Sequence, residues 1–426
     1  MPRTYLRVML LSCAVTLLLS ALVNYVVDPY GLYRAVDLAG VNTLKPKSGP
    51  NGQLVKPYRV LEVRPRTLVL GNSRTEAGLD PESAAWPEDM RPVYNLSLPA
   101  SGIDAALGGL RHVLASQPPK TVVLGIDFFD FVADARRAGK AQTREPGDLD
   151  RRLLVDRNGQ PNPARQWQVV KDHATVLFSL NTLIDTVQTV AMQRMANVAD
   201  LTAGGFYPMF EYRRFIQADG QNTMFRQVET TYLTSYLRLQ PTLYPTAGNT
   251  SPELAHLAAI IAACRAANVR LIVFVHPYHA HILESYRAAG LWDLFEEWKR
   301  AVVRVVDADR RAHPDQPAVA LWDFSGFNAI TSEDVPKASD RKTAMQWYWE
   351  AGHYNAAVGD KVLAKIFKEG DPSDTDFGVR LTPDNVEAQI ERIRAERERY
   401  ADAHAQDIEG IRKLAESIRN RGKSSR

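Results

Sequence analysis

Thr67-Leu-Val-Leu-Gly-Asn-Ser-Arg74 is a short apolar run that ends in a glycine and then in polar residues. An apolar run bounded by turn residues is typical of a buried strand. Because parallel sheets form their sites beyond the carboxyl ends of the strands, Ser73 is predicted to face a crevice. Gly71 permits a sharp turn, and N–H groups at the start of the following helix would stabilise an oxyanion. A serine that only caps this helix is the alternative.

Four more apolar runs of this kind follow along the chain and alternate with helical patterns. The alternation predicts an α/β protein, a three-layer α/β/α sandwich with a five-stranded, mostly parallel sheet of the flavodoxin-like kind. Helical apolar spacing falls on residues 103–114, 253–267 and 291–309. The four further strands are expected at residues 93–96, 121–126, 269–275 and 318–322.

The N-terminus contains an apolar segment without a charged residue, from Val8 to Val27. As a helix it is about 30 Å long, enough to cross a hydrocarbon core. Arg3 and Arg7 precede it and Asp28 follows it, which places the N-terminus in the cytoplasm. A cleaved signal peptide is the alternative, but no clear cleavage site follows, so an uncleaved anchor is favoured. We expect a single-pass protein of a bacterial inner membrane with a periplasmic domain.

The chain divides into four parts. Residues 1–28 form the cytoplasmic tip and the transmembrane anchor, and residues 29–57 form an irregular linker. Residues 58–370 form the α/β domain, whose insertion at 133–250 is too long for a plain crossover and is either a helical cap over a site or a purely structural subdomain. Residues 371–426 form a charged helical tail with an apolar stripe, expected as a half-solvated surface helix, with docking along the domain or onto a helical partner as the alternative.

Composition excludes several classes of function. The net charge is only +3, and no basic run with interleaved aromatic residues occurs, so nucleic acid is not an expected partner.

The two cysteines, Cys13 and Cys264, are poorly placed to pair, so no disulfide framework is predicted. His276, His279 and His281 lie close together, but a proline interrupts them, and a polar loop is favoured over a metal site. We expect neither a metal nor a cofactor.

A second candidate motif, Glu350-Ala-Gly-His353, follows the last predicted strand. A carboxylate three residues before a histidine can accept a hydrogen bond from Nδ1–H of the ring. Nε2 is then left to deprotonate a serine hydroxyl, which is the logic of a catalytic triad. Ser73 is the serine that the predicted sheet would bring to this histidine.

The order of these parts resembles the SGNH (GDSL-like) hydrolase superfamily, over roughly residues 65–367 with the insertion set aside. The resemblance implies that Ser73 is the nucleophile, His353 the base and Glu350 the acid that orients the base. It also implies an oxyanion hole made by backbone N–H groups of Ser73 and Gly102. The matching residues are Gly71-Asn72-Ser73, Gly102 after the second strand, Gly125-Ile-Asp127 and the pair Glu350 and His353.

Three positions depart from the family pattern. Asn72 stands where the family has an aspartate, Glu350 where it has the orienting aspartate, and Asp127 where it has an oxyanion-hole asparagine. A carboxylate at that last position opposes an oxyanion unless it is protonated, turned away or paired. Arg74 is the candidate partner of Asp127, and binding of an anionic substrate is its alternative role.

With its anchor, the layout is most similar to members of the superfamily that move acyl groups on envelope polymers, such as the D-alanylation protein of teichoic acid synthesis and the acetylation proteins of exopolysaccharides. We therefore expect a membrane-anchored O-acyl esterase or acyltransferase that acts through an acyl-serine on an envelope carbohydrate polymer. The resemblance also implies a membrane-embedded acyl exporter as a partner. The alternative is a non-catalytic relative that binds a polysaccharide or assembles an inner-membrane complex.

Overall fold

A six-stranded sheet forms the centre of the protein. The computed structural model describes residues 2–137, 147–198, 200–245, 250–368 and 376–424. The strands of the sheet are β1 (Thr67–Leu70), β2 (Val93–Asn95), β3 (Thr121–Ile126), β6 (Arg270–Val275), β7 (Ala320–Asp323) and β10 (Val379–Arg380). Their order is β10-β7-β6-β3-β1-β2, and β10 is antiparallel to β7 while all other pairs are parallel.

The α/β class is confirmed, and the five predicted strands are the parallel ones. The prediction of five strands is nevertheless incomplete, because β10 adds a sixth and makes the sheet mixed. This strand has only two residues and lies in the segment assigned to the tail. So short an element has no alternating pattern of its own, and only its pairing with β7 makes it a strand.

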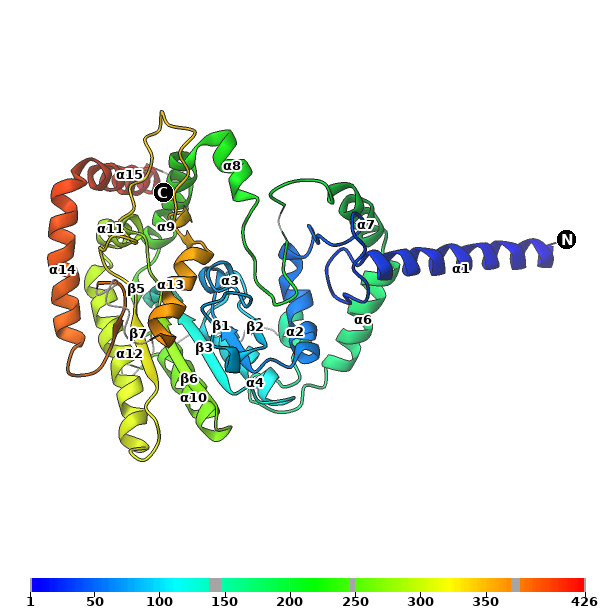
Figure 1. Cartoon of the computed structure of the whole chain (residues 1–426), viewed down its shortest axis with the longest axis horizontal. Helices are drawn as coiled ribbons and strands as arrows, with labels where there is room; N and C mark the ends of the chain where they lie inside the picture. The colour runs from blue at the N-terminus through cyan, green and yellow to red at the C-terminus, as the bar shows by residue number, and fades with distance from the viewer. Residues whose placement is uncertain (1, 138–146, 199, 246–249, 369–375, 425–426) are drawn as a thin grey trace.

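Helices flank this sheet and extend well beyond it (Figure 1). The predicted helices at 103–114, 253–267 and 291–309 are confirmed as α4, α10 and α12. The helices are α1 (Pro2–Val27), α2 (Gly52–Val63), α3 (Ser73–Gly78), α4 (Ile103–Leu114), α5 (Asp148–Arg152), α6 (Arg165–Phe178), α7 (Leu180–Met192), α8 (Tyr212–Asp219), α9 (Gln221–Leu237), α10 (Pro252–Ala266), α11 (Ala280–Ala289), α12 (Trp292–Ala312), α13 (Ala356–Phe367), α14 (Val386–Ala403) and α15 (Ala405–Ser424). Two antiparallel pairs complete the strands: β4 (Ala133–Asp134) with the distant β5 (Pro241–Thr242), and β8 (Tyr348–Glu350) with β9 (His353–Tyr354), which form a tight hairpin.

The central strands are buried on both sides. Consecutive residues of a strand point to opposite faces of the sheet, so a strand that is buried at every position must be covered on both faces. All four residues of β1 and all six of β3 are buried. This explains why both strands are continuous apolar runs instead of alternating ones.

The N-terminal helix α1 projects from the body as a straight rod (Figure 1). It begins at Pro2, earlier than the apolar run predicts, and ends at Val27. The stretch from Arg3 to Val27 is long and apolar enough to cross a membrane or to act as a signal anchor. Most of its side chains are exposed, which in water is unfavourable for so apolar a helix.

The segment at 29–57 is packed against the rest of the chain, although its composition predicts a linker. Asn42, Lys45 and Ser48 are buried there, and the side chain of Asn42 donates hydrogen bonds to the carbonyl oxygens of Val26 and Val36. These side chains satisfy backbone groups where regular structure is scarce. The segment is therefore ordered by polar contacts together with a small apolar cluster that contains Tyr30, Leu32 and Val55.

The insertion at 133–250 has two halves that lie in different places. Its helices α6 and α7 pack against α1, whereas α9 packs against α11 and α15 and contacts β8. In the tail, α14 packs on α12 and α15 on α11, each with one buried apolar stripe. Among the described helices of the insertion, α9 in its second half therefore lies beside the strand that carries Glu350.

Helices α3 and α13 approach so closely that a glycine is required at their contact. A Cβ atom on Gly359 would lie 1.7 Å from the carbonyl oxygen of Gly78. α3 begins with Ser73, and α13 follows the strand that contains His353. This contact therefore sets the distance between the two candidate catalytic segments.

Replacing Gly359 with alanine should destabilise the protein by about 2–3 kcal/mol, because the added methyl group must push two backbones apart. Gly108→Ala in α4 is the matched control, since its Cβ would meet only the end of the Leu153 side chain, at 3.3 Å. Denaturation of the full chain in detergent, followed by circular dichroism, gives both values. Equal stability of the two variants would contradict the close packing of α3 on α13.

Candidate active site

The turn after β1 presents Ser73 at the carboxyl edge of the sheet. Gly71 has a φ of +150°, and a Cβ atom there would lie 2.2 Å from Thr75 Oγ1. Asn72 is the N-cap of α3, and its side-chain oxygen accepts a hydrogen bond from the N–H of Arg74 at 3.0 Å. The cap is therefore Asn72 and not Ser73, so capping does not account for the serine, whose side chain remains half-buried at the first helical position.

His353 meets this serine from the β8–β9 pair. Its Nε2 lies 2.8 Å from Ser73 Oγ, across a separation of 280 residues. Its Nδ1 contacts Oε1 of Glu350, which is fully buried. The structure thus brings together all three residues that the sequence proposes as nucleophile, base and orienting acid.

The arrangement can perform nucleophilic catalysis. A carboxylate that accepts the Nδ1–H bond fixes the tautomer of the ring, which leaves Nε2 free to accept the proton of the serine hydroxyl. A second contact holds the carboxylate itself, because Oε2 of Glu350 accepts a hydrogen bond from the N–H of Gly352. The geometry meets the hydrogen-bond reach that a base and its nucleophile require.

Gly102 lies at the N-cap of α4, and the loop before it contacts the nucleophile turn. The hydroxyl of Ser101 donates to the carbonyl oxygen of Gly71 at 3.3 Å, and the N–H of Leu98 donates to the same oxygen at 3.2 Å. These bonds bring the start of α4 towards the turn that holds Ser73. The role of the Gly102 N–H as an oxyanion donor stays a prediction.

Asp127 is neutralised by an ion pair with Arg74. Asp127 is buried at the end of β3, where Oδ2 pairs with the Arg74 guanidinium and Oδ1 accepts the N–H of Phe129 at 2.8 Å. Burial opposes the charge of Arg74, but the adjacent Asp127 raises the pKa of the guanidinium well above its ordinary value. Arg74 is thus buried and paired with the partner that the sequence suggests, Asp127, and its alternative role of binding an anionic substrate stays a prediction.

Two tyrosine rings enclose the Arg74 guanidinium. The ring of Tyr232, from α9, lies 5.6 Å from it, and the ring of Tyr278, from the loop after β6, lies 5.3 Å from it. Such cation–π contacts favour a positive charge that water cannot reach. Tyr232 also sits against Gly352, where a Cβ atom would lie 2.7 Å from the tyrosine hydroxyl.

Asn72 has a second contact that reaches across the site. Its Nδ2 donates to Oδ2 of Asp130 at 3.1 Å. Burial and the charge of Asp127 raise the pKa of Asp130 well above its ordinary value. The amide of Asn72, which stands where the family has an aspartate, thus avoids placing a third carboxylate beside Asp127 and Asp130.

A buried ion pair between Lys56 and Glu76 lies behind α3, and the sequence does not predict it. Lys56 Nζ lies 2.7 Å from Oε1 of Glu76, both side chains are almost fully buried, and Nζ also donates to the carbonyl oxygen of Ser97. Burial raises the pKa of Glu76, although Lys56 and then His353 act to lower it. The only feature of the sequence that could indicate this pair is Glu76, an acidic residue three positions after Ser73. Its partner Lys56 lies in the segment whose composition predicts a linker.

The three clustered histidines point to three different protein partners. His276 lies 3.1 Å from the hydroxyl of Tyr354, His279 contacts the carbonyl oxygen of Glu333 at 2.9 Å, and His281 contacts a carboxylate oxygen of Glu229 at 2.6 Å. Burial lowers the pKa values of His276 and His279 well below the ordinary value. Within the described ranges, no group of three His, Cys, Asp or Glu side chains is arranged to hold a metal ion.

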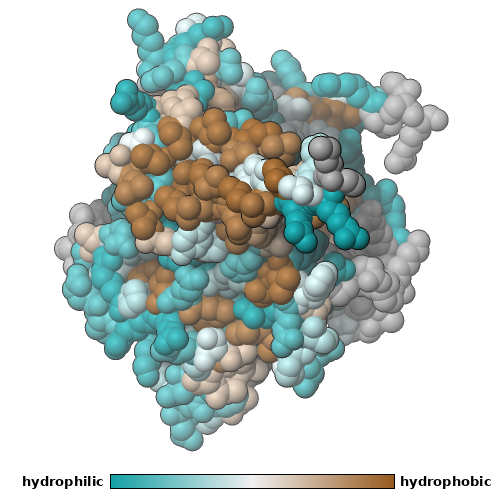
Figure 2. Space-filling model, turned by 90° about the vertical axis from the view of Figure 1, so that its right-hand side faces the viewer, coloured by the Kyte–Doolittle hydropathy of each residue, from teal (hydrophilic) through white to brown (hydrophobic). Residues whose placement is uncertain are grey.

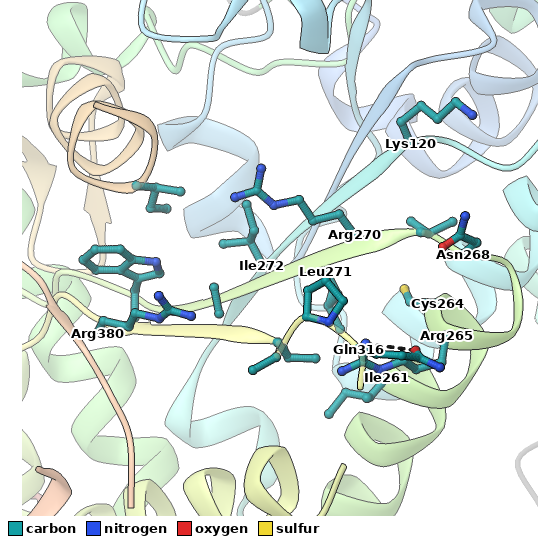
Figure 3. Close-up of a pocket in the computed structure, with 17 residues that line it drawn as sticks. Lys120, Ile261, Cys264, Arg265, Asn268, Arg270, Leu271, Ile272, Gln316 and Arg380 are labelled. Carbon is teal, nitrogen blue, oxygen red and sulfur yellow. Dashed lines mark hydrogen bonds between the residues drawn. The ribbon is translucent and has the colours of Figure 1, made fainter. Parts of the chain in front are cut away.

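A cavity of about 810 Å³ lies at the amino ends of the parallel strands, opposite the end at which Ser73 lies (Figure 3). Its lining includes Lys120, which precedes β3, and Arg270, which begins β6. Because these strands are parallel to β1, the cavity opens at their amino ends and not at the end where Ser73 lies. It does not belong to the candidate active site.

The sequence matches no protein-family model and no curated protein. The assignment of the site therefore depends on the geometry of Ser73, His353 and Glu350.

Replacing Asp127 with asparagine should destabilise the protein by about 3–5 kcal/mol, because it leaves the buried charge of Arg74 without a counterion. Asp148→Asn is the matched control: this carboxylate lies 3.6 Å from Arg151 in a half-exposed pair, and its loss should cost at most about 1 kcal/mol. Melting temperature and turnover of a small acetyl ester are measured together. Unchanged stability with increased turnover would show that Asp127 acts as a charged group in the oxyanion hole.

Proposed function

We propose that this chain is a membrane-anchored serine O-acyl esterase or acyltransferase of the SGNH type, which acts on a cell-envelope carbohydrate polymer. The observation that carries the proposal is the hydrogen-bonded series from Glu350 through His353 to Ser73. A three-layer α/β/α arrangement of the SGNH kind agrees with strands that are buried on both faces.

In the proposed mechanism, Ser73 Oγ attacks the carbonyl carbon of an ester while its proton passes to Nε2 of His353. N–H groups of Ser73 and Gly102 stabilise the oxyanion of the tetrahedral intermediate. The intermediate collapses when the leaving alcohol takes the proton from Nε2, and an acyl-serine remains. Water or a sugar hydroxyl then attacks the acyl-serine, with His353 again as the base, and regenerates the serine.

The proposed location outside the inner membrane is supported by the apolar helix α1 and by the positive charges that precede it. An acyltransferase there needs an acyl donor delivered across the membrane, so a membrane-embedded acyl exporter is the proposed partner. A polymer substrate is proposed from the resemblance to anchored envelope enzymes.

A non-catalytic relative that binds polysaccharide or assembles a complex is the alternative function. Its main support in the sequence is a carboxylate in the oxyanion hole. The ion pair between Asp127 and Arg74 removes much of the electrostatic objection to catalysis, and the intact bonds of the triad favour an enzyme.

Ser73→Ala and His353→Ala should each abolish turnover of a small acetyl ester, and Ser73→Ala should also abolish labelling by a fluorophosphonate probe, because the groups act as one unit. Glu350→Gln should reduce turnover by about 10²–10⁴-fold, since nucleophile, base and oxyanion donors remain.

Two matched controls should retain full activity. Ser116→Ala removes an exposed serine, and His256→Ala removes a histidine that forms a partly exposed pair with Glu253 at 3.1 Å. Turnover that survives Ser73→Ala would disprove the acyl-serine mechanism. A native protein that neither reacts with the probe nor hydrolyses the ester would favour the non-catalytic alternative.

A periplasmic reporter fused after Arg426 should be active, because α1 places everything after Asp28 outside the cytoplasm. Alkaline phosphatase, which folds only in an oxidising compartment, is a suitable reporter, and a cytoplasmic reporter at the same position is the control. Activity of the cytoplasmic reporter alone would contradict the proposed topology.

A further inference from the structure

Helices α6 and α7 have the reverse of the polarity that a water-facing helix shows. The buried residues of α7 are three threonines, Thr182, Thr186 and Thr189, and two of the three buried residues of α6 are Gln168 and Asp172. A surface helix of a globular protein buries its apolar side and exposes its polar side. In these two helices most of the fully buried side chains are polar instead, while large apolar side chains are exposed.

The polar sides are held by hydrogen bonds to the end of α1 and its continuation. Asn24, which is fully buried, accepts the hydroxyl of Thr186 at 2.8 Å and donates to the carbonyl oxygen of Leu177 at 2.9 Å. The hydroxyl of Tyr30 donates to Asp185 at 2.8 Å. These bonds fix which side of each helix faces the protein, so the apolar sides must face outward.

The outward sides form two apolar stripes at helical spacing. Along both helices exposed apolar positions recur every three or four residues, so each set lies on one face, although exposed polar residues such as Lys171 and Gln188 lie between them. Figure 2 shows a broad apolar area on this side of the molecule, where α1 points toward the viewer. The exposed residues are Trp167, Val170, Ala174 and Phe178 on α6 and Leu180, Ile184, Val187 and Ala191 on α7.

This apolar platform, the eight residues just named, begins where α1 ends. α1 contacts both helices, and α6 and α7 lie on either side of its base (Figure 1). The side chain of Asn42 also holds Val36, a further exposed apolar residue, beside the last turn of α1. A bilayer crossed by α1 would therefore reach the platform.

We propose that α6 and α7 lie in the outer interface of the membrane that α1 spans, with the platform turned towards the acyl chains. The inference rests on the proposed role of α1 as an uncleaved membrane anchor, but not on catalysis. The helices have 14 and 13 residues, so each is about 20 Å long, too short to span a bilayer but suited to lie in its surface. An exposed apolar face in water is unfavourable, and lipid removes that cost.

The attachment has a consequence for the site. A single helix followed by a flexible linker would let the domain rotate freely above the membrane. Contacts at α1 and at the two platform helices instead fix one side of the domain against the lipid. The carboxyl edge of the sheet then keeps a constant orientation towards the membrane surface.

The test measures lipid contact in the full chain. The native Cys13 is exposed in α1 and Cys264 is buried, so an environment-sensitive fluorophore labels the unmodified protein within α1. In a Cys13→Ser background, Ala174→Cys and Ala191→Cys place the same fluorophore on the platform. Ala395→Cys, at an exposed position of α14, is the matched control. Each protein is reconstituted in vesicles of phosphatidylethanolamine and phosphatidylglycerol, with or without doxyl-labelled lipid.

We expect doxyl lipid to quench the fluorophore at positions 13, 174 and 191 and to leave position 395 unchanged. Shallow doxyl groups should quench the platform positions more than deep ones do. Quenching at position 13 without quenching at positions 174 and 191 would overturn the inference. A blue-shifted emission at those two positions without quenching would show that a second copy of the chain, and not lipid, covers the platform, and would overturn it as well. Absence of quenching at position 13 would instead refute the membrane anchor itself.

Discussion

The buried ion pair between Arg74 and Asp127 joins four segments of the chain. Arg74 lies in the first turn of α3, Asp127 follows β3, and the two enclosing rings come from α9 and from the loop after β6. Removing two charges from water costs several kcal/mol for each ion, which only close contact offsets. The four segments must therefore meet in one arrangement, and Ser73, the neighbour of Arg74, acquires a fixed direction.

Helix α3, which begins with the candidate nucleophile Ser73, depends on contacts from outside the helix. It has six residues, far fewer than an isolated helix requires for stability in water. Asn72 caps its first turn, Lys56 holds Glu76 behind it, and Gly78 packs against α13 at its end. Because these contacts come from different parts of the chain, the serine turn depends on most of the fold.

The sequence predicts those features whose cause is local. An apolar run between turn residues identifies β1 and β3, and the spacing of Glu350 and His353 identifies their hydrogen bond before any fold is known. Features with a distant cause escape such reasoning. β10 exists because it pairs with β7, and Lys56 is buried because Glu76 lies opposite, so neither leaves a pattern in its own segment. The spacing of α6 and α7 indicates helices but not the direction of their apolar sides, which the bonds to Asn24 determine.

The distance along the chain between serine and histidine has a consequence for the newly made protein. A chain is synthesised from its N-terminus, and contacts between distant residues form late. The chain must be extended by 280 residues beyond Ser73 before the hydroxyl can meet the imidazole of His353. Until then the turn after β1 carries Ser73 without its hydrogen-bond partner, so under the proposed function a nascent chain is inactive in the compartment where it is made. The candidate catalytic unit is assembled only when the domain has folded, which would couple the onset of the proposed activity to the completion of folding.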